Sequence, residues 1–237
     1  MRVLAIVHQP NAGPGVFAEA IAASGATLDA WQLGRADPPP RDPRSYDAVL
    51  TFGGGMNADQ EDVHPWLGRE KRLLAELLEL EVPLLGVCLG AQLLAEAGGV
   101  PARRGSAPEI GWYPVQTTGQ ALGDPLFGPL APGFRALEWH SYEFPLPDGA
   151  VALARSEACL QAYRLGGASW GIQFHAEVTL ADFESWVSRY GSDPDAVALR
   201  VDPEQLRAQT RAAITGWNQL GRELCTRFLS VAESARR

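Results

Sequence analysis

The stretch from Pro83 to Leu94 constrains the fold more than any other part of the chain. It starts as a short apolar run that is typical of a buried strand, and continues from Leu89 to Ala97 as a helix that ends at a Gly-Gly pair. Cys88 lies where the strand meets the helix, with a glycine two residues before it and another two residues after it. This spacing is that of a nucleophile elbow, a sharp turn in which flanking side chains would collide with neighbouring strands.

An elbow of this kind gives a cysteine the properties of a nucleophile. The turn lifts the sulfur of Cys88 clear of the sheet and places it at a helix N-terminus, where backbone amides and the helix dipole favour the thiolate. The competing interpretation is a buried, inert thiol in an ordinary strand-to-helix turn, because cysteine is among the most buried residue types. Cys88 alone does not decide between the two.

Composition excludes several classes of function. The chain has 237 residues, of which 46% are hydrophobic, and this suits one large or two small domains. The formal net charge of -8 argues against a nucleic-acid partner, and no apolar run is long enough for a membrane span. Cys88, Cys159 and Cys225 are few and widely spaced, which indicates a reducing compartment without disulfides. The apolar opening Val3–Val7 is short and lacks a cleavage site, so we expect a cytoplasmic protein.

Apolar runs and helical stripes alternate in the N-terminal half of the chain. This alternation predicts an α/β fold with a mainly parallel open sheet and helices on both faces. Such sheets bind ligands beyond the carboxyl ends of their strands, where both Cys88 and the turn Gly53–Gly55 are expected to lie. The expected strands are Arg2–His8, Thr27–Leu33, Tyr46–Phe52 and the run after Pro83, and the expected helices are Gly15–Ser24, Trp66–Glu81 and Leu89–Ala97.

The pattern changes to short strands and turns between Val100 and His175, which predicts a small additional region of antiparallel strands. No linker or internal repeat interrupts the chain, so residues 1–237 are expected to form a single domain. The expected strands in this half are Gly111–Thr117, Phe134–Trp139, Ala150–Arg155, Cys159–Leu165 and Ser169–His175. Helices are expected at Thr179–Tyr190 and from Pro203 to about Glu233, with Gly216 and Gly221 as candidate kinks and residues 234–237 disordered.

Two nucleotide-binding motifs can be set aside. The segment Gly13–Ala18 matches the dinucleotide fingerprint, with Asp29 in the next strand, but several residues separate it from the first strand. A turn followed by a helix start is therefore the favoured interpretation. No Gly-Lys-Ser/Thr sequence follows the triglycine turn, which excludes a phosphate-binding P-loop. We expect no cofactor.

The second chemical stretch runs from Trp170 to Glu177. An apolar strand delivers His175 at its end, and Glu177 follows two residues later. A cysteine nucleophile needs a base, and the base needs an orienting acceptor, so Cys88, His175 and Glu177 supply a complete triad. His-Ala-Glu also opens the zinc deaminase signature, but the required Pro-Cys-x-x-Cys is absent. The four histidines show no paired ligand spacing, and no metal site is expected.

Together, Gly86–Gln92 and Gly171–Glu177 resemble the class I, or triad, glutamine amidotransferase family. The nearest kind is a stand-alone domain similar to the glutaminase part of GMP synthase. The similarity covers nearly the whole chain and includes Pro65–Leu67 and Glu109–Trp112. It implies a flavodoxin-like fold and hydrolysis of the side-chain amide of L-glutamine.

The resemblance also implies a role for each site residue. Cys88 would form a γ-glutamyl thioester, His175 would take the thiol proton and give it to ammonia, and Glu177 would hold the imidazole. The segment Trp139–Tyr142 would hold the amino-acid end of the substrate, although an ordinary turn is the alternative there. The remaining assignments are the amides of Gly54 and Leu89 as the oxyanion hole, and Gln92, Ser141 and Tyr142 as substrate-binding residues.

Two departures from the family pattern leave alternatives open. Gly55 stands where the family usually has proline, and fixed oxyanion geometry is a large part of acyl-transfer catalysis. The chain carries no synthetase motif, so any ammonia acceptor would belong to a separate synthetase subunit. A hydrolase of γ-glutamyl peptides or γ-glutamyl amines would use the same triad. A non-catalytic regulatory relative would not, and the intact triad argues against it.

Overall fold

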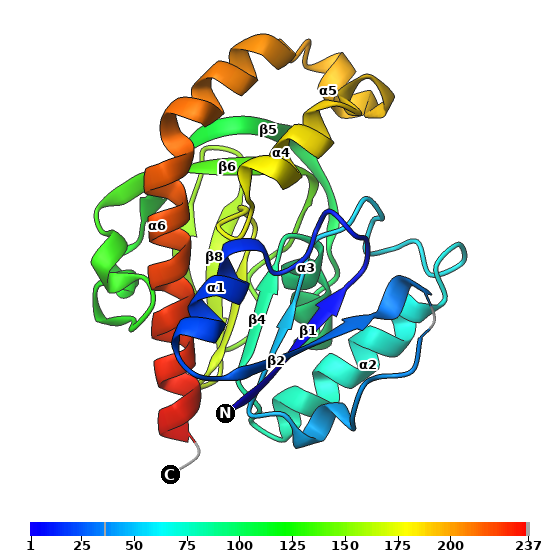
Figure 1. Ribbon diagram of the computed structural model, residues 1–237, viewed down its shortest axis with the longest axis vertical. Coiled ribbons are helices and arrows are strands. Elements are labelled where there is room, and N and C mark those ends of the chain that lie inside the picture. The colour runs from blue at the N-terminus through cyan, green and yellow to red at the C-terminus, as the bar shows by residue number, and fades with distance from the viewer. Residues whose placement is uncertain (36, 236–237) are drawn as a thin grey trace.

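The computed structural model describes residues 1–35 and 37–235. These residues form an open sheet with the strand order β2-β1-β3-β4-β9-β8-β7-β5-β6 (Figure 1). The five strands from β2 to β9 in this order are parallel, and the four beyond β9 are antiparallel to their neighbours. The α/β class, the parallel sheet and the added antiparallel region are confirmed. The strands are β1 (Arg2–Val7), β2 (Thr27–Gln32), β3 (Ala48–Thr51), β4 (Leu84–Val87), β5 (Arg103–Thr117), β6 (Gly133–Glu143), β7 (Val151–Arg155), β8 (Leu160–Leu165) and β9 (Ser169–Ile172).

Side chains of the central strands alternate between two hydrophobic cores. On β1, Val3, Ala5 and Val7 belong to one core, and Leu4 and Ile6 belong to the other. This follows from the two-residue period of a strand. Because both faces are covered, the strand is apolar and buried from Val3 to Val7, as expected for a parallel strand in the middle of a sheet.

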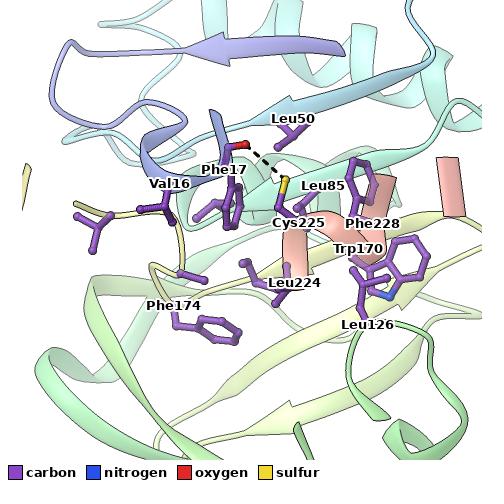
Figure 2. Close-up of a cluster of buried hydrophobic side chains, with 14 of the residues drawn as sticks. Val16, Phe17, Leu50, Leu85, Leu126, Trp170, Phe174, Leu224, Cys225 and Phe228 are labelled. Atoms are coloured by element: carbon purple, nitrogen blue, oxygen red, sulfur yellow. Dashed lines mark hydrogen bonds between the residues drawn. The ribbon is translucent and has the colours of Figure 1, made fainter. Parts of the chain in front are cut away.

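Helices α1 and α6 cover one face of the sheet, and α2 and α3 cover the other (Figure 1). Figure 2 shows the first core, in which Phe228 of α6 lies next to Trp170 of β9 and Cys225 of α6 lies next to Phe17 of α1. Burying one such aromatic side chain stabilises the fold by about 1.5–3 kcal/mol. The α-helices are α1 (Gly15–Ala23), α2 (Trp66–Glu79), α3 (Leu89–Ala97), α4 (Leu180–Val187), α5 (Pro194–Ala198) and α6 (Pro203–Ala235).

Helix α6 runs without interruption from Pro203 to Ala235, so the two glycines do not break it. Gly221 has a packing role instead, because a Cβ there would lie 2.0 Å from the carbonyl oxygen of Ala176. Trp217 Nε1 donates to the carbonyl oxygen of His175 at 2.7 Å. Helix α6 therefore fixes the backbone of the segment that follows β9. Residues 236 and 237, expected to be disordered together with 234 and 235, lie outside the described residues, whereas 234 and 235 are helical.

The region after β9 differs most from expectation. The helix predicted from Thr179 ends at Val187, and a 3₁₀ turn and α5 follow it. Asp193 caps α5 by accepting hydrogen bonds from two backbone amides, and Pro194 occupies the first helical position. This Asp-Pro pair is a helix-start signal that pattern analysis of the sequence missed. No helix among the described residues is both long enough and apolar enough to cross a bilayer.

Candidate active site

Cys88 lies at the sharp turn between β4 and α3. Its φ of 52° and ψ of -110° are strained for a residue with a side chain, as is common at functional sites. Its amide donates to the carbonyl oxygen of Ile172 at 2.8 Å, which ties the turn to β9. A Cβ on Gly90 would lie 2.1 Å from the carbonyl oxygen of Thr51, and one on Gly86 would lie 2.6 Å from a backbone oxygen. The predicted need for glycine on both sides of the cysteine is confirmed.

His175 lies between a carboxylate and the Cys88 thiol. Its Nδ1 is 2.8 Å from Glu177 Oε1, and the ring lies beside Cys88, since a Cβ on Gly53 would lie 3.1 Å from His175 Cε1 and 3.6 Å from Cys88 Cβ. Burial by itself lowers the pKa of His175, but the charges and hydrogen bonds of Glu177 and Cys88 outweigh it and raise the pKa well above its usual value. The arrangement therefore favours the protonated form of His175, held by the Glu177 carboxylate.

The backbone around this histidine is held from several sides. The amide of His175 donates to the carbonyl oxygen of Leu137 at 2.9 Å, and the ring of Trp186 meets the imidazole edge-to-face at 4.7 Å. The amide of Val16, in the first turn of α1, donates to the carbonyl oxygen of Glu177 at 2.8 Å. Gly15, part of the fingerprint-like segment, therefore begins a helix that supports the histidine segment.

Gly54 and Leu89, whose amides are the expected oxyanion donors, line the same small cavity as Cys88. This inner cavity has a volume of about 110 Å³ and is lined by Gly54–Asn57, Cys88, Leu89, Gln92, Ile110, Trp139–Tyr142, Asp193 and Asp195. Within the described part of the chain, neither amide donates a hydrogen bond to a protein acceptor. Gly54 is confined by space, since a Cβ there would lie 2.6 Å from Met56 Sδ and 3.2 Å from Leu89 Cδ2.

A buried polar network contacts the triglycine turn through the carbonyl oxygen of Gly53. Its centre is His8, whose Nδ1 is 3.1 Å from the carbonyl oxygen of Gly53 and whose Nε2 is 2.8 Å from Glu70 Oε2. Thr51 Oγ1 donates to the other Glu70 oxygen at 2.6 Å. Burial lowers the pKa of His8, but the charge of Glu70 outweighs this, and the pKa is raised. Because both ring nitrogens face acceptors, the protonated imidazole fits this site.

Gly55, the departure from the family pattern, is itself held in place. Its amide donates to Gln9 Oε1 at 2.9 Å, a hydrogen bond that proline at this position lacks. Sequence analysis missed Gln9, His8 and Glu70. The signal that could have found Glu70 is a carboxylate within the apolar stripe of α2, where its side chain is fully buried.

The residues expected to bind the substrate lie along one wall of the inner cavity. Gln92 is buried, and its Nε2 donates to the carbonyl oxygen of Tyr142 at 3.2 Å and to Gln173 Oε1 at 3.3 Å. Ser141 and Tyr142 lie on β6, so the alternative of an ordinary turn is wrong for this segment. The Tyr142 hydroxyl donates to Asp59 Oδ2 at 3.0 Å.

An outer cavity of about 530 Å³ adjoins the inner one and also contains Cys88 and His175. Its far wall comes from the region of α4 and α5, which the sequence did not connect with the site. Arg104 forms an ion pair with Asp195, and Trp139 Nε1 donates to Asp193 Oδ2 at 2.8 Å. The outer-cavity wall is defined by Arg104, Trp186, Arg189, Ser192, Asp193, Pro194 and Asp195. This wall therefore carries both positively charged arginines and negatively charged aspartates.

Comparison with known proteins identifies the family. The model of the family described as glutamine amidotransferase class-I matches residues 18–189. The chain belongs to the class I glutamine amidotransferase family. The match includes the elbow, the triglycine turn and the histidine segment, and it ends before α5 and α6.

Individual relatives agree with this family membership. The glutamine amidotransferase-like protein YfeJ of Salmonella typhimurium is 30% identical over 194 residues, which cover 79% of this chain and 80% of YfeJ. A glutamine-hydrolyzing GMP synthase subunit of Ignicoccus hospitalis is 35% identical over 143 residues, covering 59% of this chain and 71% of the relative.

Solved structures extend the similarity to the full length. A glutamine amidotransferase of Thermotoga maritima superposes with a TM-score of 0.86 at 29% identity, over 96% of this chain and 97% of the other. A glutamine amidotransferase of Methylobacillus flagellatus superposes with a TM-score of 0.84 at 26% identity, over 98% and 94% of the two chains. The similarity therefore includes α5 and α6, which the family model leaves out.

Proposed function

We propose that this amidotransferase hydrolyses the side-chain amide of L-glutamine through a γ-glutamyl thioester on Cys88. Three observations support the proposal: the strained elbow at Cys88, the His175–Glu177 pair at 2.8 Å, and the presence of Gly54 and Leu89 in the same cavity as Cys88, with neither amide bonded to an acceptor in the described structure. Nucleophile, base and oxyanion donors are the parts that acyl transfer requires.

The reaction has two halves. The Cys88 thiolate attacks the amide carbon, and the oxyanion that forms accepts hydrogen bonds from the amides of Gly54 and Leu89. Protonated His175 gives its proton to the leaving nitrogen, and ammonia departs. His175 then takes a proton from water, whose oxygen attacks the thioester. The carbon–sulfur bond of the thioester then breaks, glutamate is released, and the Cys88 thiolate and protonated His175 of the starting enzyme are restored.

Each part of the site is expected to lower the activation barrier by a known order of magnitude. General acid–base catalysis by a positioned side chain contributes about 10²- to 10⁴-fold in rate. One oxyanion donor lowers the barrier by about 3 kcal/mol. Glu177 holds the imidazole orientation that makes both proton transfers possible, and its charge stabilises the protonated ring.

The ammonia acceptor is proposed to be held by a separate synthetase subunit. The similarity to glutamine-hydrolyzing subunits of GMP synthase supports this division of labour. We also propose that residues 1–237 form one amidotransferase domain, because α6 packs in the same core as the parallel strands and bonds to His175. A cytoplasmic location stays a prediction from the sparse cysteines.

The outer cavity favours a second candidate, hydrolysis of γ-glutamyl peptides or γ-glutamyl amines. Its volume of about 530 Å³ greatly exceeds the inner cavity of about 110 Å³, so the site has room for a leaving group larger than ammonia. Arg189 and Arg104 offer donors to a carboxylate on such a leaving group. The triad chemistry is the same, and only the departing amine changes.

A substrate panel on the purified chain separates these functions. The assay measures glutamate, ammonia and kcat/KM for glutamine, γ-glutamyl amides and γ-glutamyl dipeptides. We expect slow release of ammonia from glutamine by the chain alone, and faster turnover with a synthetase partner or a larger γ-glutamyl substrate. Efficient partner-free turnover of glutamine alone would make the chain a simple glutaminase. Inactivity on every substrate would leave the non-catalytic alternative.

Covalent labelling tests the nucleophile. A glutamine-analogue electrophile should add one label per chain, located on Cys88 by mass mapping. Burial raises the pKa of Cys225 to about 12 and also raises the pKa of Cys159, so neither is expected to compete. Cys225→Ser is the matched control that keeps the label, and Cys88→Ala should abolish it. A label on Cys159 or Cys225 would refute the assignment.

A further inference from the structure

A second cluster of chemically active side chains lies behind the inner cavity. It consists of Glu109 on β5, His140 on β6 and Cys159 just before β8, whose ligand atoms all lie within 4.8 Å of one another. Glu109 Oε2 is 3.2 Å from His140 Nε2 and 3.8 Å from Cys159 Sγ. These residues are far apart in the sequence, so the cluster does not form a metal-binding motif that could be recognised from residue spacing.

Glu138 adds an independent observation. Its side chain is fully buried, and neither of its carboxylate oxygens has a hydrogen-bond partner in the described structure. Its Oε2 lies 3.5 Å from His140 Nε2, so the carboxylate is aimed at the cluster. A buried carboxylate without a hydrogen bond is costly, and buried charges are normally paired or bound to metal. Within the described structure, Glu138 therefore has an ion-pair contact with His140 but no hydrogen bond.

The donor atoms are spaced for a tetrahedral metal ion. Zinc bonds of about 2.3 Å to sulfur and about 2.0 Å to nitrogen and oxygen place neighbouring tetrahedral ligands about 3.3–3.6 Å apart. The observed separations of 3.2, 3.5 and 3.8 Å lie around this range. The ligand atoms of Glu109, His140 and Cys159 lie within 4.8 Å of one another, and Glu138 contacts this group through His140.

The histidine is oriented as a metal ligand requires. His140 Nδ1 is 3.0 Å from the carbonyl oxygen of Tyr142, and Nε2 faces the Glu109 and Glu138 carboxylates. With Nδ1–H donating to the Tyr142 oxygen, Nε2 would be the atom that binds the ion. Gln161 Nε2 and Ser156 Oγ donate to Glu109 Oε2 at 2.8 and 2.9 Å. Hydrogen bonds of this kind around a metal ligand fix its orientation and tune its basicity.

We propose that Glu109, Glu138, His140 and Cys159 form a closed site for a divalent zinc-type cation. Thiolate and imidazole ligands favour zinc over magnesium or calcium, which prefer oxygen donors. Four protein ligands leave no open position, so the site is structural rather than catalytic. Cys159 is partly exposed, which gives the ion a path into the site. The ion would join β5, β6 and the start of β8 directly behind Trp139–Tyr142.

Metal titration of the full-length protein tests the proposal. The chain is stripped with chelator and titrated with Co²⁺ as a spectroscopic probe and with Zn²⁺ in competition. We expect one metal ion per chain by elemental analysis, a thiolate-to-cobalt charge-transfer band and a metal-dependent rise in Tm. Absence of saturable binding, or binding without the thiolate band, overturns the proposal.

Matched variants locate the ion. Cys159→Ala should abolish the charge-transfer band, and Glu138→Gln, a change of similar size, should weaken affinity by more than the about 10- to 100-fold of an outer-shell substitution. Cys225→Ser and Cys88→Ala should keep full binding. Circular dichroism establishes that each variant is folded, and Glu138→Gln remains informative if Cys159→Ala is not. Loss of binding in Cys88→Ala, or retention in both ligand variants, would place the ion elsewhere.

Discussion

Replacing Glu70 by alanine tests the buried network of His8, Glu70 and Thr51 that supports the triglycine turn. The Glu70 and His8 side chains are both fully buried and 2.8 Å apart, and Thr51 donates to the second carboxylate oxygen. Removing one partner leaves the other buried without compensation, which costs about 3–5 kcal/mol. Since domains of ordinary stability have about 5–15 kcal/mol in total, Glu70→Ala should lose a large fraction of its stability.

Glu76 on the same helix provides the matched control. It also forms an ion pair, with Arg44 at 2.7 Å, but both side chains are largely exposed. Exposed pairs contribute little because water and salt screen them. Urea unfolding followed by circular dichroism should therefore show a large loss for Glu70→Ala and almost none for Glu76→Ala. Equal losses in the two variants would refute the reasoning.

The pH dependence gives a second readout of the same pair. The pKa of folded His8 is raised above the usual 6.5, so its contribution to stability is fully present below pH 6.5 and is lost as the pH rises through the folded pKa. Glu70→Gln removes the charge that raises this pKa and should flatten that decline. A decline unchanged in Glu70→Gln would show that His8 does not titrate with this partner.

Three further predictions concern the catalytic segment. Gly54→Val should lower kcat about 100-fold, equivalent to about 3 kcal/mol for one oxyanion donor. It should also lower Tm, because a Cβ there would lie 2.6 Å from Met56 Sδ. Unchanged turnover would make the turn a simple connector. Gly221→Ala should lower kcat and Tm together, because its Cβ would lie 2.0 Å from a carbonyl oxygen, whereas Gly216→Ala has open space and should leave kcat unchanged. Glu177→Gln should move the alkaline limb of the kcat/KM pH profile to lower pH, because it removes the charge that most raises the pKa of His175; an unmoved limb would contradict this.

Local sequence patterns predicted the elements that present the site. The elbow could be identified from a strand followed by glycine, cysteine, glycine and a helix. This local pattern is informative because Gly86 and Gly90 lie so close to backbone atoms that no side chain fits at either position. His175 and Glu177 were found because they follow directly after an apolar strand. The mainly parallel direction of the strands could also be predicted, since alternating strands and helices have few packing solutions.

The features that could not be predicted from the sequence depend on contacts between segments that are distant in the chain. His8 and Glu70 are 62 positions apart, and Glu70 looks like one more charged residue of an amphipathic helix. The start of β5 at Arg103 was missed because Arg103–Pro108 shows no apolar alternation, and a register shift follows Arg104. The wall from α4 to α5 was missed because its capping signal is short and its function depends on where the helices pack.

The last strand of the chain, β9, occupies the middle of the sheet, between β4 and β8. During synthesis β4 leaves the ribosome long before β9, so the nascent chain carries the Cys88 thiol without an imidazole beside it. The carbonyl oxygen of His175 then needs Trp217, which is made later still. Cys88, His175 and Glu177 therefore come together only after almost the entire chain has been translated. A product that ended before β9 would carry the elbow without His175 and Glu177.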